Sequence, residues 1–148
     1  MKYLSLFIAF VLLISSCNNA GGKKEESGKE PQPDMVLVEK LSADLKNEPK
    51  NAALYFKRGQ AYRAVKMDSL ALMDFQKATV LDSSESKYFS AVGDLLFEHK
   101  DITGSVPWFQ KSLALNPGDE KAHPKMAKLF LYIEEFPKAF VEINTVLR

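Results

Sequence analysis

The sequence has few of the residues that catalytic and metal sites need. Of 148 residues, one is cysteine, Cys17, and two are histidine, His99 and His123. A single cysteine cannot form a disulfide within its own chain. Neither histidine has a partner at a metal-ligating or acid–base spacing, and HExxH, GxSxG and glycine-rich phosphate motifs are absent from the sequence. We therefore expect no enzyme, no cofactor and no metal site, and we assign both histidines to packing or capping.

An excess of either charge is also missing. The chain has 20 Lys and Arg residues against 19 Asp and Glu residues. Without a basic surface to attract phosphates, nucleic acid is not an expected partner. A chain of 148 residues that is 46% apolar and 26% charged is typical of one small globular domain.

The sequence does contain a repeat, whose first unit is residues 52–85. Its small residue Gly59 recurs as Gly93 after 34 residues, and Ala127 stands at the same place after 34 more. Two further sets keep this register, namely large residues (Tyr55, Tyr62, Phe75; Phe89, Leu96, Phe109; His123, Phe130, Ile143) and small ones (Ala71, Ser105, Ala139). Small residues allow two helices to approach closely, and large residues at helical spacing fill the seam between them.

This pattern resembles the tetratricopeptide repeat (TPR), in which each unit is a pair of antiparallel helices. The resemblance implies an all-α helical-repeat solenoid with units at residues 52–85, 86–119 and 120–148. Departures occur at Arg58, where the family has an apolar residue, at Ser83, where it has proline, and in the third unit, which lacks the glycine and the leading aromatic residue. The frame predicts helices at residues 51–65, 68–81, 86–99, 102–115, 120–133 and 137–147.

Three local features refine this prediction. Pro107 and Pro124 each favour a kink or a later helix start. Asp68 can cap the second helix of unit one. A lone helix at residues 35–46 matches a second helix without its first, and we expect it to cover the start of the stack.

The first 16 residues are typical of a secretory signal peptide. Lys2 precedes an apolar run at residues 4–14, which is too short to span a membrane. Residues 14–17, Ile-Ser-Ser-Cys, resemble a bacterial lipobox, which implies cleavage before Cys17 and modification of Cys17 by acyl chains such as palmitate. The alternative is a plain secretory signal that happens to contain a cysteine. The lipobox implies a lipoprotein of the bacterial cell envelope, at the outer membrane on its periplasmic or surface face.

Residues 17–34 predict a flexible tether, because they are rich in Gly, Lys, Glu, Ser and Pro and have no apolar periodicity. Fully extended, such a tether reaches about 55 Å. Within it, Lys24-Glu25-Glu26 resembles the signal that follows the lipidated cysteine of surface lipoproteins in Bacteroidota. A solvated charge run explains these three residues equally well.

The TPR resemblance also implies a binding site, because the first helices of successive units line a concave groove in that family. The matching positions are Phe56, Gln60 and Arg63 in unit one, Ser90, Asp94 and Phe97 in unit two, and Lys121, Lys128 and Leu131 in unit three. Aromatic residues there can hold an apolar peptide side chain, and the cations can hold a carboxylate. The alternative is a solvated face. Of the five clamp residues that bind chaperone tails in some relatives, only Lys121 and Lys125 are matched, so that ligand is not expected.

We therefore expect a lipid-anchored, non-catalytic adaptor or scaffold that binds proteins or peptides. The alternative is a structural subunit of an envelope assembly that works by end-to-end stacking. Phe140 and Leu147 occupy positions that contact a following unit, so they predict, with Leu131, an apolar patch for self-association or a chain that is naturally longer. On the same helix, Ala139, Ile143 and Val146 are expected to face the first helix of their own unit.

Overall fold

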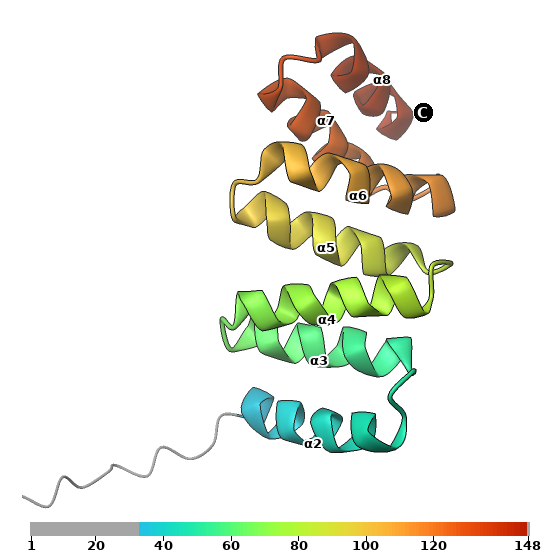
Figure 1. The fold of residues 1–148 in the computed structure, drawn as a ribbon. Coiled ribbons are helices and arrows are strands. Elements are labelled where there is room, and N and C mark those ends of the chain that lie inside the picture. Colours follow the sequence, from blue (N-terminus) through green and yellow to red (C-terminus); the bar gives the residue numbers. More distant parts are fainter. Residues whose placement is uncertain (1–32, 148) are drawn as a thin grey trace, which may run out of the picture. The chain divides into compact units, whose positions relative to one another are not determined.

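The computed structural model describes residues 33–147, which contain seven α-helices (Figure 1). These are α2 (Pro33–Asn47), α3 (Ala52–Ala64), α4 (Asp68–Leu81), α5 (Ser86–Glu98), α6 (Ile102–Leu115), α7 (Ala122–Tyr132) and α8 (Phe136–Val146). In this part of the chain no helix is sufficiently long and apolar to span a membrane. The predicted signal peptide, Cys17 and most of the predicted tether fall in residues 1–32, outside the described residues.

The helices pack as a stack of antiparallel hairpins. α3 packs against α4, α5 against α6 and α7 against α8, while α2 packs against α3 at the start of the stack. Contacts between α4 and α5 and between α6 and α7 join successive hairpins. The predicted all-α repeat architecture is confirmed, and every predicted helix end lies within two residues of the observed one.

The two helices of each hairpin approach closely at the small residues of the repeat. A Cβ atom added to Gly59 would lie 2.6 Å from the Phe75 ring, and one added to Gly93 would lie 3.0 Å from the Phe109 ring. These distances are too short for a side chain, so the glycines make room for the phenylalanines of the facing helix. Both phenylalanines are fully buried, which explains why glycine and aromatic residues repeat together.

Each hairpin is closed by the same turn. Lys66, Lys100 and Glu134 follow α3, α5 and α7 and have positive φ angles of 63°, 65° and 60°. In the first turn the Lys66 amide donates to the Arg63 carbonyl (3.0 Å) and the next amide, that of Met67, donates to Tyr62 (2.9 Å). This pair of bonds is the Schellman motif, which satisfies the last carbonyls of a helix and usually places glycine at the left-handed position.

A buried ion pair accounts for the departure at Arg58. Its Nε and Nη2 atoms donate to the two carboxylate oxygens of Asp74 at 2.7 and 2.8 Å, and the Asp74 side chain is 7% exposed. The Nη1 atom donates to Ser42 Oγ at 3.1 Å. Arg58 therefore connects α3 with α4 and with the covering helix α2, which itself buries Val38, Leu41 and Leu45.

Some local predictions need correction. α2 begins at Pro33, so the last two residues of the predicted tether are helical, and proline is well suited to a first helical position. α6 runs continuously through Pro107, so a later start is wrong there. α7 does start late, at Ala122, which places Pro124 in the first turn, where no amide is needed. Asp68 is the first residue of α4 rather than its cap, and it contacts His99 Nε2 at 3.0 Å.

The last helix is only partly buried. Ala139 is 1% exposed and faces α7 as predicted, but Ile143 and Val146 remain 41% and 43% exposed. Phe75 and Phe109, the equivalents of Ile143 in the earlier units, are buried and pack against residues of the following hairpin as well. No helix follows α8 in the described residues, and the predicted orientation of Ile143 and Val146 toward α7 stays a prediction.

Candidate functional site

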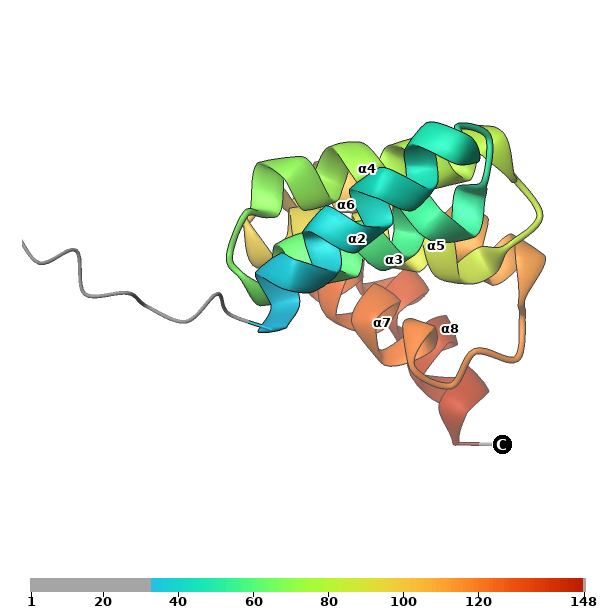
Figure 2. The same ribbon diagram turned by 90° about the horizontal axis from the view of Figure 1, so that it is seen from below.

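A groove of about 960 Å³ lies along the first helices of the stack. Viewed along the stack, α3 and α5 lie on one side, and α4 and α6 on the other (Figure 2). α3 and α5 supply two walls of the groove, and the third wall is formed by the segment at residues 116–121 and the start of α7. Three repeat units therefore contribute to one concave surface.

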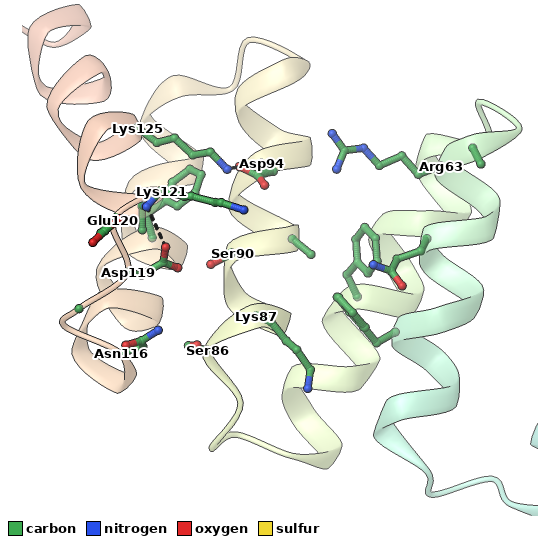
Figure 3. Close-up of a pocket in the computed structure, with 18 of the residues that line it drawn as sticks. Arg63, Ser86, Lys87, Ser90, Asp94, Asn116, Asp119, Glu120, Lys121 and Lys125 are labelled. Carbon is green, nitrogen blue, oxygen red and sulfur yellow. Dashed lines mark hydrogen bonds and ion pairs between the residues drawn. The ribbon is translucent and has the colours of Figure 1, made fainter.

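Six of the nine predicted binding residues line this groove. Five come from the two helical walls (Phe56, Gln60, Arg63, Ser90, Asp94), and Lys121 comes from the third wall. Figure 3 shows Arg63 and Lys121 extending into the groove from opposite sides. The repeat register therefore places side chains from α3, α5 and the start of α7 around one space.

The other three predicted residues lie outside the lining of this groove. The Phe97 ring packs partly buried against the cluster that contains Phe109 and Met126, and it meets the Tyr132 ring edge-on at 6.2 Å. The Lys128 ammonium lies 5.4 Å from the centre of the Phe97 ring. Leu131 is 48% exposed. Phe97 is thus used for packing between units two and three, and Lys128 covers it.

The positions predicted from the repeat register did not include one wall of the groove. Asn116, Gly118, Asp119 and Glu120 belong to the turn between α6 and α7 and line the groove. The Asp119 carboxylate shapes this turn by accepting hydrogen bonds from the Lys121 and Ala122 amides at 3.0 and 3.2 Å. The run Asn-Pro-Gly-Asp signals a turn in the sequence, but nothing in that composition shows that the turn faces the groove.

Aromatic rings form the floor of the groove. The Phe56 ring lies 5.6 Å from the Phe75 ring and 5.0 Å from the Tyr88 ring, measured between centroids. Phe75 is 1% exposed and Tyr88 3% exposed, whereas Phe56 is partly buried and reaches the groove surface. The floor offers an apolar contact that is already held in place by packing.

A hydroxyl network beside the floor leaves one acceptor pointing into the groove. Ser112 Oγ donates to the Ser86 carbonyl at 3.1 Å and lies 2.6 Å from Ser90 Oγ. Either hydroxyl can be the donor between Ser90 and Ser112, and in both cases the Ser90 oxygen keeps at least one lone pair for a ligand, such as a backbone amide.

The rim of the groove has more positive than negative side chains. Five cations (Arg63, Lys66, Lys87, Lys121, Lys125) and three carboxylates (Asp94, Asp119, Glu120) line it. Arg63 pairs with Glu98, Lys125 with Asp94 at 2.5 Å, and Lys87 with Glu85 at 2.7 Å. The Glu85 hydrogen bond raises the pKa of Lys87 above its usual value, so this amine stays charged.

Lys121 is different from the paired cations. Within residues 33–147 its ammonium group has no ion pair or hydrogen bond. The charge of Lys121 is therefore available to a ligand, whereas Arg63 and Lys125 would have to give up a carboxylate of their own chain. Lys66, which also lines the groove, has no ion pair in this part of the chain either, so Lys121 and Lys66 are the two rim cations available to an anionic group.

Neither histidine lies in an arrangement typical of catalysis. His99 is exposed and contacts Asp68, while His123 lies between Glu142 of α8 and the Pro117 carbonyl. In the part of the chain that the structure describes, no cluster of three or more His, Cys, Asp or Glu residues is arranged to hold a metal ion.

No protein-family model and no curated protein matches the sequence. Solved structures do match the fold. A structure of MamA is 21% identical with a TM-score of 0.69, covering 74% of this chain and 64% of that protein. The fold is TPR-like. YrrB, described as a TPR protein with an unusual peptide-binding site, is 19% identical with a TM-score of 0.68, and the match covers 74% of this chain and 56% of YrrB.

The TPR-like chain thus spans about 60% of the length of the structures it matches. A double mutant of MamA RS-1 extends the match to 77% of this chain, with a TM-score of 0.71 at 16% identity. Identities this low show that the helical architecture is shared and leave the groove residues of each protein to be considered separately.

Proposed function

We propose that the chain is a non-catalytic adaptor that binds an extended peptide or protein segment in the groove. The observation that carries the proposal is the combination of the packed Phe56 floor, the free acceptor on Ser90 and the unpaired Lys121 in one concave surface built by three units. An apolar side chain can occupy the floor while Ser90 receives a backbone amide and Lys121 attracts a carboxylate. The description of YrrB as a peptide-binding TPR protein supports this reading of a similar fold.

We further propose that Cys17 carries acyl chains and anchors the adaptor in a bacterial envelope, at the outer membrane. The support is the lipobox-like sequence at residues 14–17, which precedes a Gly-, Glu- and Lys-rich stretch. Two or more acyl chains give stable membrane binding, whereas a single chain is marginal. In this arrangement the groove presents a bound segment at the membrane.

Peptide binding can be tested with residues 31–148, because all three buried core clusters lie within this compact unit. A peptide array identifies binding sequences, and fluorescence anisotropy gives their affinities. Gln60→Trp should block the groove, because Gln60 is exposed on its surface, and Lys121→Glu should weaken anionic peptides about tenfold, as expected for one charge-assisted contact.

The matched control is Lys77→Glu, which makes the same charge change on the exposed surface of α4, outside the groove lining. Both groove variants should keep the wild-type melting temperature. If Gln60→Trp and Lys121→Glu bind every selected peptide as wild type does, the groove is not the binding site.

A second candidate function, end-to-end assembly, is favoured by the surface of α8. Phe136, Phe140, Ile143 and Leu147 follow one another at spacings of four, three and four residues and are 60%, 66%, 41% and 77% exposed. This spacing is that of a helix-packing seam. Leu131 of α7 is also exposed, at 48%. Sedimentation at rising concentration should show association that Phe140→Glu and Leu147→Glu abolish, and a monomer throughout would exclude this function for residues 31–148.

A further inference from the structure

His123 links the third wall of the groove to the last helix. Its Nδ1 atom lies 2.6 Å from Glu142 Oε2 on α8, and its Nε2 atom lies 2.9 Å from the carbonyl oxygen of Pro117. Pro117 belongs to the turn at residues 116–121 that lines the groove. The His123 and Glu142 side chains are 12% and 18% exposed, so their contact is largely shielded from water, whereas the contact with the Pro117 carbonyl is exposed.

The chemistry of the two partners determines the protonation of the ring. A carbonyl oxygen can only accept a hydrogen bond, and an ionised carboxylate can only accept one as well. The imidazole must therefore donate from both nitrogens, which only the imidazolium form can do. A neutral ring has a single N–H and can hold either Pro117 or Glu142, but not both.

We propose that His123 is a positioning residue which, as the imidazolium, holds the wall at residues 116–121 against α8, so that loss of its proton releases this wall. Lys121, an unpaired cation of the groove in the described residues, belongs to the released segment. The effect on ligand affinity rests on the proposed function, whereas the link between the ring and the wall does not.

Surrounding charges favour the protonated, bridging form of the ring. Two carboxylates act on the ring, Glu142 from α8 and Asp119 from the turn before α7, and no cation is among the groups that shift its titration. The hydrogen bond to Glu142, followed by the bond to Pro117, raises the pKa of His123 above its ordinary value of 6.5. Burial acts in the opposite direction and is outweighed.

The sign of the pH dependence follows from this raised pKa. The folded protein holds the proton more tightly than the unfolded chain does, so the stabilisation is complete below about pH 6.5. It is lost as the pH rises through the folded-state pKa. The wall should therefore be held in acidic solution up to about pH 6.5 and released as the pH rises through the folded-state pKa, which lies above 6.5.

The test is an NMR titration of residues 31–148 between pH 5.5 and 9. The carbon-bound protons of the two histidine rings report their own titration, and the amides of Gly118, Asp119 and Lys121 report the wall. We expect these amides to shift along the His123 titration curve, with a midpoint above 6.5. A His123 titration midpoint at or below pH 6.5, or wall amides whose chemical shifts do not follow the His123 titration, would overturn the proposal.

Two variants distinguish a positioning role of the His123 imidazolium from a role in packing alone. Glu142→Gln keeps an acceptor at the same place but removes its charge, so the His123 midpoint and the wall amides should move together to lower pH. His123→Phe supplies the aromatic residue that the repeat favours at this position, and it should abolish the titration of the wall amides while the core remains folded. Wall amides that still titrate in His123→Phe would contradict the assignment.

The control is His99→Gln, which removes the other histidine. His99 is exposed and contacts Asp68 of the preceding hairpin, away from the turn at residues 116–121, so its loss should leave the wall amides unchanged. A peptide selected for the groove should bind wild type more weakly above the His123 midpoint and His123→Phe equally at all pH values. If no peptide binds at any pH, the proposed function fails, while the ring and amide measurements still decide the inference.

Discussion

Removing the Asp74 carboxylate is expected to destabilise the fold strongly. In Asp74→Ala, Arg58 loses two charged hydrogen bonds of 2.7 and 2.8 Å while remaining only 19% exposed. Arg58 cannot lose its charge instead, because the pKa of a guanidinium is already far above neutral and the Asp74 hydrogen bond raises it further. Breaking a buried pair by removing one partner costs about 3–5 kcal/mol.

We expect a value near the lower limit, about 3 kcal/mol, because the guanidinium is not completely buried. It also keeps its stacking on the Tyr55 and Tyr62 rings, whose centroids are each 5.6 Å away, and its hydrogen bond to Ser42. Urea unfolding of residues 31–148 measures the free energy of unfolding, and an unchanged dependence on urea concentration shows that the unfolded state is comparable. Glu39→Ala, an exposed acidic residue of α2, is the control and should change stability by less than about 0.5 kcal/mol.

A double mutant provides the decisive comparison. Arg58→Leu with Asp74→Leu removes both charges and leaves no uncompensated group, so it should be more stable than Asp74→Ala alone. The repeat normally has an apolar residue at position 58, which gives leucine a compatible environment. A cost of less than about 1 kcal/mol for Asp74→Ala, or a double mutant as unstable as the sum of its single mutants, would contradict the proposed contribution of this ion pair.

Three more predictions concern the anchor, the seam and the turns. In a bacterial host, Cys17→Ser should leave the precursor uncleaved by the lipoprotein-specific peptidase and unlabelled by radioactive palmitate. Labelling at the wild-type level would show that Cys17 is not the acylated residue. Ala71→Leu should overpack the seam beside Phe75 and cost about 1–3 kcal/mol in urea unfolding, since Ala71 is fully buried, whereas exposed Lys77→Ala on the same helix should be nearly neutral. Lys100→Gly should remove the backbone strain of a non-glycine residue with a φ of 65° and raise the free energy of unfolding by about 1 kcal/mol. A loss of stability would mean that contacts of the lysine side chain compensate for this strain.

The repeat pattern was sufficient to predict the architecture, because each hairpin is specified by its own residues. Gly59 and Phe75 contact each other within a single unit, so the 34-residue period carries the packing rule directly. Arg58 could be identified only as a departure from the period. Its partner Asp74 lies 16 residues away, and nothing in the local sequence marks the two as a pair.

The groove was predictable where the wall is helical. Positions on α3 and α5 follow from the register, whereas the turn at residues 116–121 is held by His123, whose partner Glu142 is 19 residues further along the chain. The prediction that Phe97 lines the groove was not met for a related reason. A register states which face of a helix a residue occupies, but Phe97 lies where units two and three meet, and contacts between units determine its neighbours.

The apolar surfaces at the two ends of the stack are covered to different degrees, so local unfolding is expected to begin at one end. At the first hairpin, α2 buries three apolar residues and is tied to Arg58 through Ser42, whereas α8 leaves its outer apolar surface in water. In a stack held by neighbouring contacts, the hairpin with the fewest contacts opens at the lowest free energy. Amide exchange in residues 31–148 should therefore be fastest in α8 and α7 and slowest near α3 and α4. The turn wall of the groove would then open in transient events while the two helical walls remain folded, which offers a bound segment a route of entry and exit from one side.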